Sequence, residues 1–98
     1  MLTIRDVQRV VADIYNVTRH DLICERRCRD VTAPRQIAMW ICGEVLIDKS
    51  ISQLARAFNR DRTTITHGMK RGREITAYSL EHIGKVNQII QLLREKAI

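Results

Sequence analysis

Residues 50–69 read SISQLARAFNRDRTTITHGM, and this stretch decides the fold of the chain. It opens with a capping box, because Ser50 and Gln53 have the spacing at which each side chain bonds the other residue's backbone at the start of a helix. Behind the box, apolar residues recur at the intervals of one helical face. This stripe consists of Ile51, Leu54, Ala55 and Phe58. The pattern predicts a helix over residues 50–58.

A second helix follows after a short interruption at residues 59–61. Asp61 has a side chain that caps a helix start well, so the next helix is expected from Arg62. One face of that helix carries only apolar or small side chains, namely Ile65, Gly68, Met69 and Gly72. Glycines there would let another helix approach closely, at a cost in helix propensity. Two helices joined by a tight turn indicate a helix-turn-helix, which we place at about residues 50–76.

The remaining chain is also helical in pattern. Thr3 with Asp6 and Thr18 with Asp21 repeat the spacing of the capping box. Pro34 suits the first turn of a helix, where N–H groups have no helical partner. Further helices are therefore predicted at residues 3–15, 18–24, 35–47 and 80–96, with a loop at 26–33. The apolar face of the last helix would hold Leu80, Ile83, Val86, Ile90 and Leu93.

These patterns define the class of fold. No segment alternates like a strand over more than four residues, so we expect an all-α fold of five or six helices. The length of 98 residues predicts a single domain, residues 1–98. No run approaches the roughly 20 apolar residues of a membrane span, and no leader peptide is evident at the start. The protein is therefore expected to be soluble and cytoplasmic.

The net charge of +6 is concentrated in two segments. Residues 26–35 carry four arginines against one aspartate, and residues 56–73 carry six basic side chains against one acidic side chain. All but one of these basic residues are arginine, which bonds phosphate and guanine edges through paired N–H groups. Such clustering is typical of a protein that binds a polyanion.

Chemistry other than binding has little support. The three histidines are scattered, and neither an activated nucleophile nor a carboxylate pair is evident, so we do not expect an enzyme. The three cysteines form an odd set without a fourth ligand at a zinc-like spacing. We therefore expect no disulfide, metal site or cofactor.

The start of the helix from Arg62 has the character of a DNA-reading end. It offers Arg62, Thr63 and Thr64, and one turn later Thr66 and His67. In a helix-turn-helix the second helix enters the major groove with its N-terminal residues on base edges. The arginines at 26–29 could enter a narrow minor groove, where the negative potential is strong. The alternatives are a plain helical hairpin and a loop whose charges are simply solvated.

Two motifs carry a resemblance to a known family. One is the helix start Pro34-Arg35-Gln36, and the other is the turn Arg60-Asp61-Arg62-Thr63-Thr64. Together with Arg26-Arg27-Cys28-Arg29, they are similar to the C-terminal DNA-binding domain of the bacterial replication initiator DnaA. Further matching residues extend to about residue 75: Leu2-Thr3-Ile4, Gln8, Val11-Ala12, Asp21-Leu22, Val31, Ile37-Ala38-Met39, Ala57-Phe58, Ile65 and His67.

The resemblance implies a six-helix, Trp-repressor-like domain that binds a short asymmetric duplex site, the DnaA box. By this resemblance Arg27 would enter the minor groove, Arg35 would reach base edges and Gln36 would contact the DNA backbone. Asp61, Thr63 and Thr64 would act at the start of the recognition helix. The predicted DNA-binding residues are therefore Arg27, Arg35, Gln36, Arg60, Asp61, Arg62, Thr63, Thr64 and His67.

Three departures from the family bear on the target sequence. Arg62 stands where the family has histidine, Asn59 replaces a pair of glycines, and the connection at residues 46–49 is one residue longer. The scaffold and the binding mode are expected to survive these changes. The resemblance does not fix the exact target sequence, because Arg62 stands at a base-reading position.

The predicted function is sequence-specific binding of double-stranded DNA by a monomer. The chain has no Gly-x-x-x-x-Gly-Lys-Ser/Thr loop for ATP, so we expect either an excised domain or a free-standing relative without the ATPase. The alternative is a small phage or mobile-element regulator that represses transcription or modulates host initiation. Its protein partner could be the host initiator, docked on the last helix.

Overall fold

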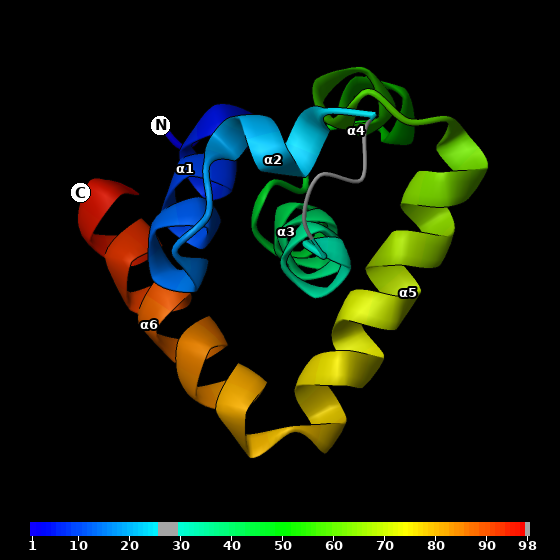
Figure 1. The fold of residues 1–98 in the computed structure, drawn as a ribbon. Coiled ribbons are helices and arrows are strands. Elements are labelled where there is room, and N and C mark those ends of the chain that lie inside the picture. Colours follow the sequence, from blue (N-terminus) through cyan, green and yellow to red (C-terminus); the bar gives the residue numbers. More distant parts are fainter. Residues whose placement is uncertain (26–29, 98) are drawn as a thin grey trace.

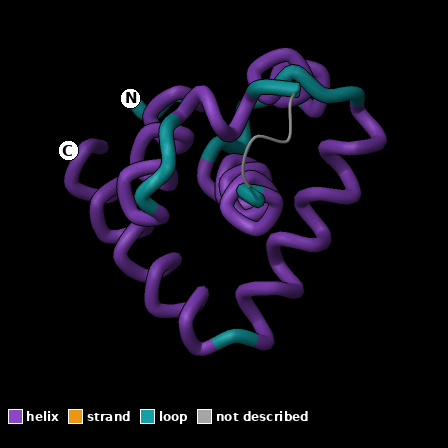
Figure 2. Tube along the Cα trace, in the orientation of Figure 1, coloured by secondary structure: helices purple, strands orange, loops and turns teal. Residues whose placement is uncertain are grey.

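The computed structural model describes residues 1–25 and 30–97, and every regular element within them is an α-helix (Figures 1 and 2). The helices are α1 (Ile4–Tyr15), α2 (Arg19–Ile23), α3 (Thr32–Val45), α4 (Ile51–Phe58), α5 (Arg62–Tyr78) and α6 (Leu80–Ala97). The predicted all-α fold of five or six helices is confirmed, with six helices in the described residues. In the described part of the chain, no helix is both long and apolar enough to cross a membrane.

Side-chain caps define the starts of several helices, as the sequence predicts. At α1 the Thr3 hydroxyl accepts from the Asp6 N–H at 3.1 Å, and the Asp6 carboxylate accepts from the Thr3 N–H at 2.9 Å. Hydrogen bonding of the Asp6 carboxylate, chiefly to the Thr3 backbone N–H, lowers the pKa of Asp6. The same reciprocal box starts α2 at Thr18–Asp21 and α4 at Ser50–Gln53. The caps supply partners for N–H groups that a helix cannot satisfy internally.

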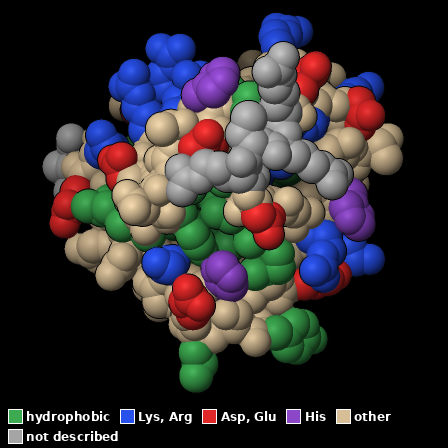
Figure 3. Space-filling view, viewed as in Figure 1, with side chains coloured by type: hydrophobic (Ala, Val, Ile, Leu, Met, Phe, Trp, Pro, Cys, Tyr) green, Lys and Arg blue, Asp and Glu red, His purple; other side chains and the backbone are tan. Residues whose placement is uncertain are grey.

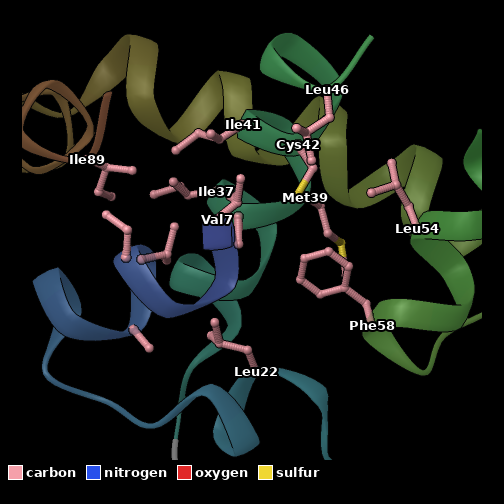
Figure 4. Packing of buried hydrophobic residues seen from close by; sticks show 14 of the residues in the cluster. Val7, Leu22, Ile37, Met39, Ile41, Cys42, Leu46, Leu54, Phe58 and Ile89 are labelled. Atoms are coloured by element: carbon pink, nitrogen blue, oxygen red, sulfur yellow. The ribbon is translucent and has the colours of Figure 1, made fainter. Parts of the chain in front are cut away.

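α3 is the centre of the fold. It is seen end-on in Figure 1, with α1 and α6 on one side and α5 on the other. Ile37 and Met39 of α3 are buried, and Figure 4 shows Ile37 beside Val7 of α1 and Met39 beside Phe58 of α4. The apolar surface of α3 is therefore covered from several directions. Its most extensive partner is α5.

Glycines on α5 allow its close contact with α3. A Cβ atom at Gly68 would collide with the sulfur of Met39, and Gly72 lies against the α3 backbone. Both glycines are buried. The prediction that small residues at these positions let another helix approach is confirmed. The position of α5, and with it the helix-turn-helix, is set by direct backbone packing on the central helix.

Two details differ from the sequence-based expectations. α3 begins at Thr32, within the predicted loop, because Pro34 can occupy the third helical position without losing a hydrogen bond. The first ladder bond of α3 runs from the Arg35 N–H to the Val31 oxygen at 3.0 Å. Leu80, predicted on the apolar face of the last helix, is 89% exposed because it lies at the corner where α5 ends.

α6 closes the core against α1 with three buried residues, Val86, Ile89 and Leu93. A polar contact joins the same two helices: the Tyr15 hydroxyl lies 2.7 Å from Nδ1 of His82. The two rings are stacked with their centroids 5.7 Å apart, and the Lys85 ammonium lies 5.3 Å from the Tyr15 ring centre. These contacts fix the N-terminal half of α6 to the end of α1.

Candidate nucleic-acid interface

The turn between α4 and α5 is built from residues suited to its backbone. Asn59 adopts the left-handed conformation with φ of 56°, which asparagine tolerates better than most residues other than glycine. The chain then reverses, and the Arg60 N–H bonds back to the Ala55 oxygen at 3.0 Å. This geometry explains how asparagine can stand where the family pattern has glycine.

Asp61 caps α5, as predicted. Its carboxylate accepts from the Thr64 N–H at 2.7 Å. Hydrogen bonds from the backbone and side chain of Thr64, with a further one from the backbone of Thr63, lower the pKa of Asp61. The carboxylate is therefore charged at neutral pH and held at the helix N-terminus. Asp61, a predicted site residue, thus lies at the start of α5.

The first two turns of α5 have two distinct faces. Ile65 and Gly68 are buried against the core. The opposite face is exposed and carries Arg62, Thr63, Thr64, Thr66, His67 and Lys70. The Thr66 hydroxyl donates to the Arg62 carbonyl at 3.1 Å, which leaves its methyl group and an accepting oxygen to meet a ligand. A helix with one buried face and one polar, basic face can be inserted into a groove without disturbing the core.

Two hollows lie on either side of this exposed face. The first, of about 500 Å³, is bordered by α3, the turn and α5, and it contains Arg35, Gln36, Arg60, Asp61, Thr64 and His67 among its lining residues. The second, of about 540 Å³, is lined by Ile51, Arg62, Thr63, Thr66, His67 and Lys70. The structure thus brings together the eight predicted site residues that it describes. His67 borders both hollows.

The guanidinium groups of Arg35 and Arg60 are turned toward the backbone of α2. Arg35 donates to carbonyl oxygens in α2, and Arg60 donates to carbonyl oxygens at the end of α2 and in the turn. Both side chains are partly buried. Their predicted contacts with DNA stay predictions.

The basic residues of α5 differ in their pairing. Arg71 forms an ion pair with Glu74 at 2.9 Å, three residues further along the helix. Among the described residues, the structure gives no acidic partner to Arg62 or Lys70. Figure 3 shows Lys and Arg side chains gathered over α5 and again near α1. The charges of Arg62 and Lys70 are therefore available to an anionic ligand.

Two side-chain roles were missed by sequence reasoning, one at the interface and one in the core. Lys70 lies in the second hollow, and its spacing of one helical turn from Thr66 could have revealed it. Gln8 is buried and bridges three helices: its amide donates to the Ala57 oxygen at 3.1 Å, and its oxygen accepts from Nε of Arg19 at 3.0 Å. No local signal marks this second role.

Part of the predicted site lies outside the described residues, namely Arg27 and its neighbours at 26–29. Cys28 lies there too. Within residues 1–25 and 30–97, no group of three or more histidine, cysteine or acidic side chains is placed to hold a metal ion.

The fold and the exposed face of α5 define a helix-turn-helix domain of the kind that presents a recognition helix. The chain matches the family described as bacterial dnaA protein helix-turn-helix over residues 4–71, and it belongs to that family.

Curated relatives agree with this assignment. The chain is 35% identical over 94 residues to the chromosomal replication initiator protein DnaA of Ruegeria pomeroyi, covering 95% of this chain and 19% of the relative. It is 33% identical over 95 residues to the protein of the same name from Rickettsia canadensis, covering 96% of this chain and 20% of the relative. The chain thus spans about a fifth of the length of these relatives.

Proposed function

We propose that this chain binds a short site in double-stranded DNA, of the DnaA-box type, with the start of α5 in the major groove. The observation that carries the proposal is the division of α5 into a face packed on α3 and an exposed face bearing Arg62, Thr63, His67 and Lys70. An α-helix with its side chains is about 10–12 Å across. The major groove is about 12 Å wide, so it accepts such a helix.

The exposed side chains suggest a division of labour on DNA. Arg62 and Thr63 lie at the N-terminal end of α5, where a recognition helix meets base edges. Arginine donates two hydrogen bonds to guanine, and threonine packs its methyl group against thymine or bonds a base edge. Lys70 is two turns further along and is suited to a phosphate, as a flexible point charge. Arg62 thus sets the preferred base at its position.

A second contact is proposed for Arg27, on the basis of the sequence alone. It belongs to the basic segment 26–35 and matches the minor-groove arginine implied by the family resemblance. Minor-groove contacts distinguish mainly A·T from G·C pairs. The proposed target is therefore an asymmetric site with a major-groove part and an A·T-rich minor-groove part, bound by one copy of the chain.

Selection of bound sequences from a random duplex pool tests this function. We expect recovery of one short asymmetric motif related to the DnaA box, with a changed preference at the base that Arg62 reads. Fluorescence anisotropy on the selected duplex and on a shuffled duplex then gives the specificity ratio.

The salt dependence provides a second test. If the chain neutralises about four phosphates, its affinity should fall about 100-fold between 50 and 200 mM salt, because counterions are released on binding. Failure to enrich any motif, together with a flat response to salt, would exclude DNA as the ligand.

A further inference from the structure

The C-terminal end of α2 is held by side chains from other parts of the fold. From the start of α3, the Arg35 guanidinium reaches two successive carbonyl oxygens of α2. Its Nη2 donates to the Asp21 oxygen at 3.1 Å, and its Nε donates to the Leu22 oxygen at 2.9 Å. These carbonyls belong to the last turn of α2. The last C=O groups of a helix have no N–H partner within the helix.

The next two carbonyl oxygens are bonded by Arg60 from the turn between α4 and α5. Its Nη2 donates to the Cys24 oxygen at 2.8 Å, and its Nη1 makes a longer bond of 3.4 Å to the Ile23 oxygen. Two arginines that are 25 positions apart in the sequence thus donate hydrogen bonds to four consecutive carbonyl oxygens, from Asp21 to Cys24. We call this arrangement the α2 clamp.

We infer that Arg35 and Arg60 are positioning residues of the DNA-binding domain: they hold the end of α2 against the helix-turn-helix, and Arg60 does so in place of a phosphate contact. The inference concerns how the interface is assembled, and it rests on the proposed function where DNA binding is the readout. It assigns to both residues a structural role that the family resemblance does not name.

The length of α2 explains why it needs the clamp. It has only five residues, and a helix of that length is not stable without tertiary contacts. Its first turn is secured by the Thr18–Asp21 capping box. The clamp secures its other end, at the point where the chain continues into the basic segment that begins at residue 26.

Both terminal nitrogens of the Arg60 guanidinium donate hydrogen bonds within the protein. Besides the two carbonyls of the clamp, Nη1 donates to the Phe58 oxygen at 3.2 Å and to the Asn59 oxygen at 3.0 Å. The side chain therefore joins the end of α2 to the turn that precedes the recognition helix. A lysine could not replace it, because only the planar guanidinium presents several donors in a fixed array.

Amide hydrogen exchange on the free protein tests the clamp without DNA. In Arg60→Lys and Arg35→Lys we expect the amides of Ile23 and Cys24 to exchange at least tenfold faster than in the wild type, while amides of α6 keep their rates. Arg94→Gln, a change of an exposed arginine in α6, is the control and should leave α2 unchanged. Unchanged exchange at α2 in Arg60→Lys would overturn the inference.

Salt titrations of DNA binding distinguish positioning from direct contact. If Arg60 positions α2, Arg60→Lys and Arg60→Gln both weaken binding by about tenfold at every salt concentration and keep the wild-type slope. If Arg60 instead contacts a phosphate, Lys restores binding and Gln lowers the slope by about one; that result would overturn the inference. A wild-type chain that does not bind DNA would defeat the proposed function, and the exchange measurement would still decide on the clamp.

Discussion

Gly72 of α5 lies directly on the backbone of Gln36 in α3: a Cβ atom added to the glycine would come within 2.7 Å of the Gln36 carbonyl carbon. Real Cβ atoms do not approach backbone that closely, so the two helices can keep their spacing only with glycine here. Gln36 borders the hollow beside the recognition helix. The packing of this pair therefore determines both the stability of the fold and the width of the candidate interface.

We expect Gly72→Ala to destabilise the protein by about 1–3 kcal/mol, since α5 must move away from α3 to admit the methyl group. Gly84→Ala is the matched control, because a Cβ atom there meets nothing within 4 Å. Removing a glycine from an exposed helix interior should stabilise the protein by up to about 1 kcal/mol. Urea unfolding of both variants checks the contrast; equal stability of Gly72→Ala and the wild type would contradict the packing described.

The buried Gln8 side chain is expected to be essential for attaching α4 to α1. Gln8→Ala removes the partner of the Ala57 oxygen and of Arg19, and leaving such groups unpaired costs about 1–3 kcal/mol. The same change at Gln88, which is exposed on α6, should alter stability by no more than about 0.5 kcal/mol. Thermal or urea unfolding compares the two variants. A small effect at Gln8 would mean that water replaces its bonds.

The raised pKa of Tyr15 leads us to expect a loss of folding stability at alkaline pH. Burial, with a contribution from the charge of Glu81, raises its pKa from 10.0 to about 12. The folded state holds this proton more tightly than the unfolded state does, so the stabilisation is complete below pH 10 and disappears as the pH rises toward 12.

Burial also raises the pKa of Cys42 to about 12, so this thiol titrates in the same range. Comparison of the wild type with Tyr15→Phe isolates the effect of Tyr15, because Cys42 is present in both proteins. The difference in unfolding free energy between wild type and variant should change in favour of the variant between pH 10 and 12. A constant difference across this range would show that Tyr15 titrates normally.

On DNA, Arg62→Ala and Thr63→Ala are expected to reduce discrimination between the selected site and its single-base variants. Each base contact typically contributes about 1–3 kcal/mol of specificity. Lys70→Gln should instead weaken binding equally on all sequences and lower the salt slope by about one. Anisotropy titrations on a small panel of duplexes measure both quantities. The assignment of the recognition helix would fail if Arg62→Ala lowered specific and random binding by the same factor.

For Arg27 we expect an effect that depends on the flanking sequence. Arg27→Ala should cost about 1–3 kcal/mol on a site flanked by A·T pairs, and clearly less on one flanked by G·C pairs. Arg27→Lys should restore only part of the affinity, because lysine is more strongly hydrated and loses more on entering a narrow groove. Equal losses on both flanks would argue against a minor-groove contact.

Local rules made much of the fold predictable. The capping boxes at Thr3, Thr18 and Ser50 place helix starts, because their hydrogen bonds span only three residues. The cap at Asp61 and the apolar face through Ile65 identify α5 and its outward face in the same way. These predictions hold because the interactions that decide them are contained within one helical turn.

The roles of long polar side chains could not be predicted in this way. By charge and motif, Arg35 and Arg60 are equivalent to Arg62, yet the fold turns the first two toward carbonyls of α2 and leaves the third exposed. Leu80 fits the period of an apolar face, but the corner between α5 and α6 leaves it in solvent. Periodicity indicates which face of a helix is apolar and says nothing of what lies opposite each end.

The sequence by itself determined the helical class, the helix starts that carry a side-chain cap and the residues on the outer face of α5. Only the tertiary structure decided that α5 rests on the backbone of α3 at Gly72 and that Gln8 joins α1 to α4. It also decided that Arg35 and Arg60 donate hydrogen bonds to the carbonyl oxygens at the end of α2. The physical reason is the range of the interactions. Caps and apolar stripes act within a few residues, whereas the partner of a buried amide or guanidinium is a carbonyl that the chain brings near only when it has folded.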